Sequence, residues 1–109
     1  MKLYLDDKRQ TPPGWTRAYT AQETIDYLKT GEVEELSLDH DLGIEEIVGN
    51  GYMVLQWIEQ EVFLRRFKPP GVMAVHSANG PATERMLQAI DAIRKMAEGD
   101  TAAEGTLSE

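Results

Sequence analysis

Four short candidate strands, separated by turns and by segments with helical periodicity, constrain the fold of this chain most. They occupy residues 2–5, 15–19, 35–38 and 72–75, and the first is a short apolar run with the composition of a buried strand. Strands that alternate with helices predict a parallel sheet covered by helices on its faces. Because the chain has only 109 residues, we expect a single α/β domain with a small sheet of about four strands over residues 1–97.

Three further segments are predicted to be helices. The first begins after Thr20, which is followed three residues later by a glutamate, the spacing of a capping box. The second covers about residues 52–67, and the third begins near Pro81 and ends at about residue 97. Two prolines and a glycine within residues 8–14 exclude a helix between the first two strands. Residues 98–109 are mostly small and polar, which predicts a disordered C-terminal tail.

The composition excludes several classes of function. The chain has 11 basic and 19 acidic residues and a net charge of −8, so no extended nucleic-acid footprint is expected, because phosphate neutralisation needs clustered Lys and Arg. No cysteine is present, which excludes disulfides, thiolate ligands and cysteine nucleophiles and fits a cytoplasmic protein. No apolar run approaches the ~20 residues that span a bilayer, so no membrane segment is expected.

Acidic side chains follow two of the predicted strands. Asp6 and Asp7 come after the first strand, and Asp39 and Asp41 come after the third. Because ligands gather outside the carboxyl ends of parallel strands, these carboxylates are expected to share one edge of the sheet. A divalent cation, Mg²⁺ or Mn²⁺, would relieve their repulsion. We predict Asp6, Asp7 and Asp39 as metal ligands, with Asp41 in reserve. In the alternative, the pair begins a turn and Asp41 caps a loop.

Both histidines of the chain also lie at predicted strand ends. His76 follows the fourth strand, where it could act as general acid or base or bind a phosphate oxygen. Its alternative role is structural, with the ring bonded to a nearby carbonyl. His40 is less well placed, because strand alternation points it away from Asp39 unless the strand has already ended. The catalytic candidates are therefore His76, Asp39 and His40.

Four further residues are candidates for binding phosphate. Ser77 and Asn79 precede the last helix, whose N-terminal N–H groups and dipole favour an anion, although both residue types also serve as N-cap and turn residues. Lys8 and Arg9 follow the acidic pair and are the cations nearest to it in sequence. They would neutralise a bound phosphate, or they are simply solvated.

The order of these motifs resembles a response-regulator receiver domain, which has a flavodoxin-like parallel sheet. The acidic pair Asp6-Asp7, the phosphoacceptor position at Asp39 and the hydroxyl position at Ser77 all match. Two features differ from that family: a loop at residues 8–14 replaces the first helix, and no fifth strand with its lysine follows the last helix.

These departures, together with three motifs, resemble the divergent cyclic-phosphate-processing branch of receiver-like domains. The motifs are Leu-Tyr-Leu-Asp-Asp at residues 3–7, Ser-Leu-Asp-His-Asp-Leu-Gly at 37–43 and His-Ser-Ala-Asn at 76–79. The resemblance extends to about Met96. It implies a metal-dependent domain that acts on cyclic phosphate ends of RNA or on related cyclic nucleotides.

Three functions remain open from the sequence. The first is a metal-dependent phosphoesterase that processes cyclic phosphates, with RNA ends or cyclic nucleotides as substrates. The second is a signalling domain in which Asp39 accepts a phosphoryl group, although the missing lysine strand counts against it. The third is a module that binds a phosphate or nucleotide without turnover.

Overall fold

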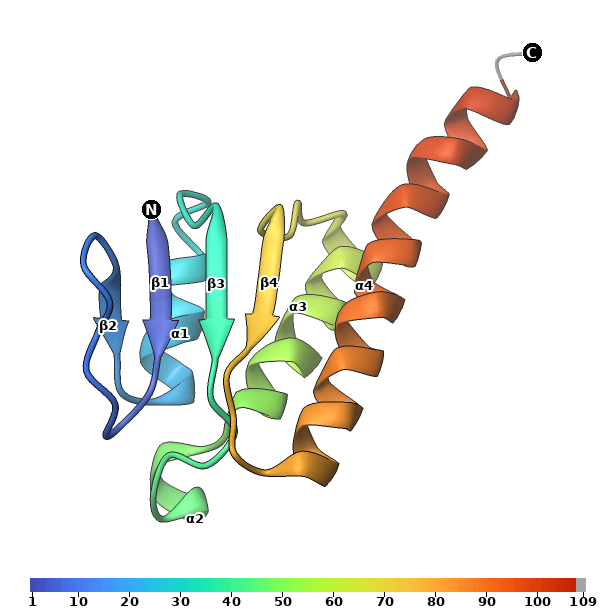
Figure 1. The fold of residues 1–109 in the computed structure, drawn as a ribbon. Helices are drawn as coiled ribbons and strands as arrows, with labels where there is room; N and C mark the ends of the chain where they lie inside the picture. Colours follow the sequence, from blue (N-terminus) through green and yellow to red (C-terminus); the bar gives the residue numbers. More distant parts are fainter. Residues whose placement is uncertain (108–109) are drawn as a thin grey trace.

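The four predicted strands form one parallel sheet. The computed structural model describes residues 1–107, and their side chains as far as residue 99. In chain order the elements are β1 (Lys2–Leu5), β2 (Thr16–Ala18), α1 (Ala21–Leu28), β3 (Glu35–Leu38), α2 (Glu45–Val48), α3 (Gly51–Arg65), β4 (Val72–Val75) and α4 (Gly80–Leu107). The sheet order is β2-β1-β3-β4, with every neighbouring pair parallel (Figure 1). The predicted α/β fold is therefore confirmed.

The core lies between one face of this sheet and the three longer helices. Alternate strand residues such as Leu3, Leu5, Leu36 and Leu38 have no exposed surface. They join a single apolar cluster with side chains from α1, α3 and α4, helices that lie on one side of the sheet in Figure 1. The opposite face of the sheet carries the intervening residues, and no helix of the described chain packs on it.

The loop between β1 and β2 explains why that face is uncovered. Residues 6–15 contain no helix, as their prolines predict, and four strands are the whole sheet within residues 1–107. Compared with the receiver pattern, the first helix and the fifth strand are both missing from the described chain. The aromatic ring of Trp15, just before β2, packs edge-on against Tyr4 with centroids 6.2 Å apart. The face is therefore partly shielded by a loop and remains accessible at its carboxyl edge.

The helices begin at polar caps. The Thr20 hydroxyl accepts from the Glu23 N–H at 3.1 Å and caps α1 as expected. The Asn50 side chain accepts from the Met53 N–H at 2.9 Å at the start of α3. The Asn79 side chain does the same for α4, where it accepts from the N–H of Ala82 at 3.1 Å. These caps satisfy N–H groups that have no partner within the helix.

Two segments differ from the sequence-based expectations or extend beyond them. The short helix α2 was not expected, because four residues are too few to show helical periodicity. Helix α4 extends to Leu107, about ten residues beyond its expected end, so its last turns overlap the expected tail at residues 98–109. Part of that tail lies outside the described residues, and its disorder stays a prediction. Within residues 1–107, no helix is long and apolar enough to cross a membrane.

Candidate functional site

The register of three strands brings the functional side chains to one level. Leu5 pairs with Leu38, and Leu38 pairs with Val75. The ladder continues one residue further, because the Asp39 N–H donates to the Leu5 carbonyl at 3.0 Å and the His76 N–H donates to the Leu38 carbonyl at 2.9 Å. Asp6, Asp39 and His76 therefore follow three neighbouring strands side by side. Alternation directs their side chains away from the leucine core and toward the face without helices.

Asp6 is the most enclosed carboxylate of the site, with 1% of its side chain exposed. Its Oδ1 accepts the N–H groups of Lys8 and Arg9 at 2.7 and 2.8 Å. Its Oδ2 accepts from Arg9 Nη1 at 2.9 Å and from His76 Nε2 at 3.0 Å. Burial alone would raise the pKa of this carboxyl, but the two N–H groups, the guanidinium and His76 outweigh burial and hold the pKa well below its usual range. Asp6 is therefore ionised.

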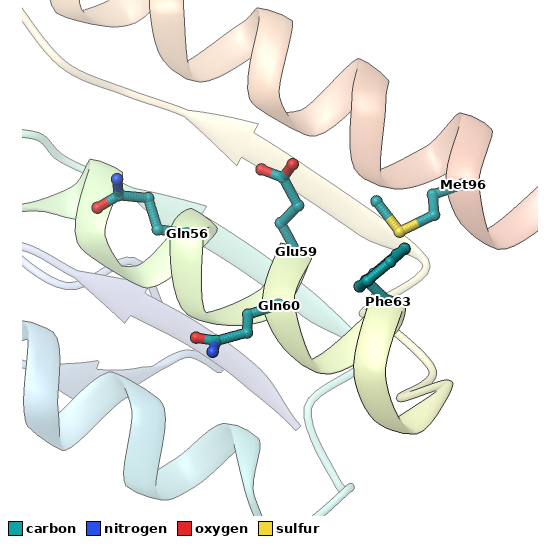
Figure 2. Close-up of a pocket in the computed structure, with 5 residues that line it drawn as sticks. All are labelled: Gln56, Glu59, Gln60, Phe63 and Met96. Atoms are coloured by element: carbon teal, nitrogen blue, oxygen red, sulfur yellow. The ribbon is translucent and has the colours of Figure 1, made fainter.

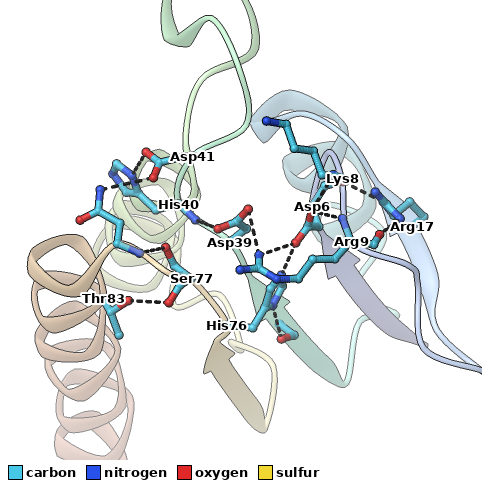
Figure 3. A network of polar contacts seen from close by, with 12 residues as sticks. Asp6, Lys8, Arg9, Arg17, Asp39, His40, Asp41, His76, Ser77 and Thr83 are labelled. Atoms are coloured by element: carbon cyan, nitrogen blue, oxygen red, sulfur yellow. Dashed lines mark hydrogen bonds and ion pairs between the residues drawn. The ribbon is translucent and has the colours of Figure 1, made fainter.

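Asp39 lies opposite Asp6 across the guanidinium of Arg9. Its side chain is 9% exposed, and its Oδ2 lies 3.4 Å from Arg9 Nη1. Its Oδ1 accepts the N–H of His40 at 2.8 Å. A single arginine thus neutralises part of the charge of two buried carboxylates (Figure 3).

A glycine fixes the position of Asp39. A Cβ on Gly51, the first residue of α3, would lie 2.0 Å from the Asp39 carbonyl oxygen and 2.8 Å from Met86 Cε. The Gly51 N–H donates to the His40 carbonyl at 3.1 Å. Helix α3 can therefore begin directly against the end of β3 only because this residue has no side chain.

Three of the predicted metal ligands come together. One carboxylate oxygen from each of Asp6, Asp7 and Asp39 can be chosen so that all three lie within 4.8 Å of one another. Mg²⁺ prefers oxygen ligands, usually one or two carboxylates with waters and substrate phosphate. The donor set therefore fits a hard divalent cation. Asp41, the reserve ligand, is not in this group and is 67% exposed.

His76 is held on both sides of its ring. Nε2 contacts Asp6, and Nδ1 lies 2.7 Å from the Ser37 hydroxyl. Because an ionised Asp6 can only accept, Nε2 carries the proton and Nδ1 accepts from Ser37. The ring also stacks on Tyr4, with centroids 4.2 Å apart and planes 3° apart. Burial lowers the pKa of His76 by more than Asp6 raises it, so the ring is neutral at pH 7.

The second histidine belongs to a separate cluster. His40 Nδ1 lies 2.8 Å from Asp41 Oδ1, and the Asn79 amide donates to Asp41 Oδ2 at 3.3 Å. The hydrogen bond from His40 is the main cause that lowers the pKa of Asp41. These contacts connect the end of β3 with the start of α4. Figure 3 shows the His40 ring beside Asp41 rather than beside the carboxylate of Asp39, as strand alternation predicts.

The predicted phosphate-binding residues make local contacts. The Ser77 hydroxyl accepts from the Asn79 N–H at 3.0 Å, and the Asn79 side chain caps α4. Lys8 contributes its backbone N–H to Asp6, and its side chain is exposed. Of these four residues, Arg9 alone places its side chain between the buried carboxylates. Of the two structural roles weighed for these residues, Ser77 takes that of a turn residue and Asn79 that of an N-cap, and their binding of phosphate stays a prediction.

Sequence reasoning missed three residues of the site. Ser37 and Tyr4 hold the His76 ring, and Arg17 donates from Nε to the Asp6 carbonyl at 2.7 Å. Two signals could have found Ser37 and Tyr4. Alternation places Ser37 on the same side of β3 as Asp39 and Tyr4 on the same side of β1 as Asp6, and aligning the strand ends would have set all four beside His76.

A hollow elsewhere on the molecule is not part of this site. It has a volume of about 330 Å³ and lies between α3 and α4, away from the carboxyl edge of the sheet (Figure 2). Its lining residues are Gln56, Glu59, Gln60, Phe63 and Met96. It contains no histidine or clustered carboxylates, so it offers no acid–base or metal chemistry comparable to that of the sheet edge.

A parallel sheet in this order, with an acidic cluster at its carboxyl edge, defines a receiver-like α/β domain. Residues 1–92 match the family model of the cyclic-phosphate processing receiver domain. The chain belongs to that family, and the resemblance inferred from its motifs is confirmed. Comparisons with curated proteins and with solved structures gave no significant match.

Proposed function

We propose that this domain is a divalent-cation-dependent phosphoesterase that opens cyclic phosphates, at RNA ends or in cyclic nucleotides. The observation that carries the proposal is the convergence of Asp6, Asp7 and Asp39, whose oxygens lie within 4.8 Å of one another. Asp6 and Asp39 are buried, and since the single guanidinium of Arg9 neutralises only part of their charge, a divalent cation would compensate the rest. Membership of the cyclic-phosphate processing family supports the choice of substrate.

The reaction is a hydrolysis. The oxygen of water forms a bond to phosphorus, the bond from phosphorus to one ribose oxygen breaks, and that oxygen takes a proton to leave a phosphomonoester. Mg²⁺ or Mn²⁺ held by Asp6, Asp7 and Asp39 would supply a Lewis acid that polarises the phosphate. Ser77 and Asn79, at the start of α4, are the proposed contacts for the outer phosphate oxygens.

His76 is the proposed proton carrier. Within the described residues it is the histidine whose ring contacts the acidic cluster, and burial keeps that ring neutral. In the resting arrangement its Nε2 proton is shared with Asp6, so proton transfer requires the ring to exchange Asp6 for water or the leaving oxygen. Asp6 and Ser37 orient the ring, as carboxylates and hydroxyls commonly do for catalytic imidazoles.

The test is phosphorus NMR with 2′,3′-cyclic nucleotides and a cyclic-ended oligonucleotide in Mg²⁺, in Mn²⁺ and in chelator. We expect cation-dependent loss of the cyclic resonance with the wild-type protein and none with Asp39→Asn. Asp91→Asn is the matched control, because Asp91 is 63% exposed on α4, away from the acidic cluster, and forms an ion pair with Lys95. His76→Gln keeps an N–H donor for Asp6 and is expected to bind Mn²⁺ but not to turn over substrate. Turnover by Asp39→Asn at the wild-type rate would contradict the proposal.

A second candidate function is phosphoryl acceptance at Asp39. The observation in its favour is the position of Asp39, at the end of β3 and beside the acidic pair. Labelling with a small phosphodonor such as acetyl phosphate separates the two functions. An acceptor gains mass in the wild-type protein and not in Asp39→Asn, and it does not depend on His76. Binding of a cyclic nucleotide without product would instead favour a non-catalytic binding module.

A further inference from the structure

One nitrogen of Arg9 occupies the space where the two buried carboxylates meet. Nη1 lies 2.9 Å from Asp6 Oδ2 and 3.4 Å from Asp39 Oδ2. The other oxygen of each carboxylate already accepts backbone N–H groups, two at Asp6 and one at Asp39. The two oxygens that accept no backbone N–H are therefore the two that Arg9 contacts, and Asp6 Oδ2 also accepts from His76 Nε2 at 3.0 Å (Figure 3). A cation bound through both would take the place of Nη1.

The backbone of Arg9 is anchored, whereas its side chain is partly exposed to solvent. Its N–H donates to Asp6 Oδ1 at 2.8 Å, and its carbonyl accepts from Arg17 Nη1. The side chain of Arg9 is 43% exposed, and it comes from a loop rather than from a strand or helix. Rotation of the guanidinium into solvent breaks its own contacts with Asp6 Oδ2 and Asp39 Oδ2 and leaves the backbone hydrogen bonds of Arg9 in place. The arginine can therefore leave the carboxylates without unfolding the site.

Charge makes the two cations exclude one another. A guanidinium and a divalent cation on the same oxygens would lie within a few ångströms of each other, where like charges repel. Once displaced, the guanidinium stays tethered at the rim of the site. Arginine binds phosphate oxygens through paired N–H groups, so a phosphate beside the metal would give the displaced guanidinium a new partner.

We propose that Arg9 is an exchangeable cation: it neutralises Asp6 and Asp39 until a divalent cation displaces it, and it then binds the phosphate of the substrate. This inference rests on the proposed function, since it assumes that the same carboxylates hold the metal. Its consequence is that metal and phosphate bind cooperatively, because the first frees the residue that recognises the second. The acidic site is thereby kept from binding phosphate until the metal is in place.

The first test compares Mn²⁺ affinity, measured by electron paramagnetic resonance of free Mn²⁺, in three proteins. Arg9→Ala keeps the backbone N–H on Asp6 and removes the competing cation, so Mn²⁺ should bind roughly tenfold more tightly, a coupling within the usual range. Lys8→Ala is the control for charge alone. Its side chain points away from the Arg9 guanidinium in Figure 3, and Mn²⁺ binding should tighten by no more than about twofold. Equal tightening in both variants, or none in Arg9→Ala, would overturn the exchange.

The second test begins with the wild-type protein and follows the NMR signal of the Arg9 side chain. In the ¹⁵N spectrum of the arginine side chains, adding Mg²⁺ should move the Arg9 Nε–H signal toward that of a solvated arginine, and a signal that does not move overturns the proposal. Inorganic phosphate is then titrated into Mg²⁺-loaded protein, where Arg9→Ala should bind it roughly tenfold more weakly than wild type. Equal phosphate affinity would also overturn the proposal.

The outcomes separate this inference from the function on which it rests. If neither the wild-type protein nor the variants bind Mn²⁺, both the exchange of Arg9 and the proposed cation-dependent function are wrong. If wild-type protein binds Mn²⁺ and opens cyclic phosphates while Arg9→Ala gains no metal affinity, the exchange alone is wrong. Circular dichroism of Arg9→Ala confirms that the fold is retained.

Discussion

Replacing Gly51 by alanine should damage both the fold and the metal site, because this residue touches the backbone that carries Asp39. The added Cβ would lie 2.0 Å from the Asp39 carbonyl oxygen, and real Cβ atoms essentially never approach closer than 3.0 Å. The start of α3 and the end of β3 must therefore separate by at least 1 Å. Met86 Cε, at 2.8 Å, can turn aside, but the peptide of Asp39 cannot move alone, since its N–H is bonded to Leu5.

The size of the effect follows from overpacking. Forcing an extra carbon into a packed interior typically costs about 1–3 kcal/mol, and strain on the hydrogen bond from Gly51 to His40 adds to this. For a domain of this size, about 2 kcal/mol lowers the melting temperature by roughly 8–16 °C. A ligand carboxylate displaced by about 1 Å should also weaken Mn²⁺ binding by at least tenfold, because divalent cations hold their oxygens at short, fixed distances.

The assay is urea unfolding together with Mn²⁺ titration of Gly51→Ala and of a control. Gly71→Ala is the matched control, because its Cβ would meet nothing closer than the Glu34 carbonyl at 4.0 Å. The control should stay within about 0.5 kcal/mol of wild type. If Gly51→Ala unfolds like the wild-type protein and binds Mn²⁺ with the same affinity, the reasoning that this glycine positions Asp39 is refuted.

Three further predictions concern the N-cap of α1 and the partly buried His76. Thr20→Ala should lower the free energy of unfolding by about 1 kcal/mol through loss of the N-cap; an unchanged urea midpoint would show that the cap contributes nothing. Ser37→Ala should cost about 1 kcal/mol, because Nδ1 of His76 loses its donor, and an unaltered ¹⁵N shift of that nitrogen would contradict the contact. The fold keeps His76 neutral whereas the unfolded chain protonates it below its ordinary pKa of 6.5, so the free energy of unfolding should fall as pH drops below that value. Urea unfolding in chelator from pH 8 to 5.5 should show this loss of stability in the wild-type protein and not in His76→Gln. The same dependence of unfolding free energy on pH in both proteins would contradict the claim that the fold keeps His76 neutral.

Much of the fold could be predicted because each local signal agreed with the packing. The apolar run at residues 2–5 and the cap at Thr20 each specify one element without long-range information, and the prolines at 12 and 13 exclude a helix between the first two strands. The helix α2 could not be predicted, since Glu45–Val48 makes a single turn with no buried residue to set a period.

The candidate site was predicted only in part, because its contacts join residues far apart in the chain. Asp6, Asp7 and Asp39 could be grouped from the rule that strand ends converge. That rule does not distinguish Asp41, which turns toward His40 and Asn79. The same rule does not predict the position of Arg9. The sequence suggested that Arg9 binds phosphate or is solvated, but its guanidinium lies between the carboxylates of Asp6 and Asp39. Such a contact depends on the path of a loop, and a loop has no periodic sequence pattern from which its path could be predicted.

The most direct test of the account is phosphorus NMR of one sample carried through removal and return of the cation. Wild-type protein with a cyclic-ended oligonucleotide and Mg²⁺ should convert the cyclic resonance to that of a phosphomonoester, stop when excess chelator is added, and resume when Mg²⁺ is restored. Asp39→Asn should leave the cyclic resonance intact throughout. Conversion that continues in chelator, or that proceeds equally in Asp39→Asn, would contradict the claim that this acidic cluster holds the cation at which the cyclic phosphate is opened.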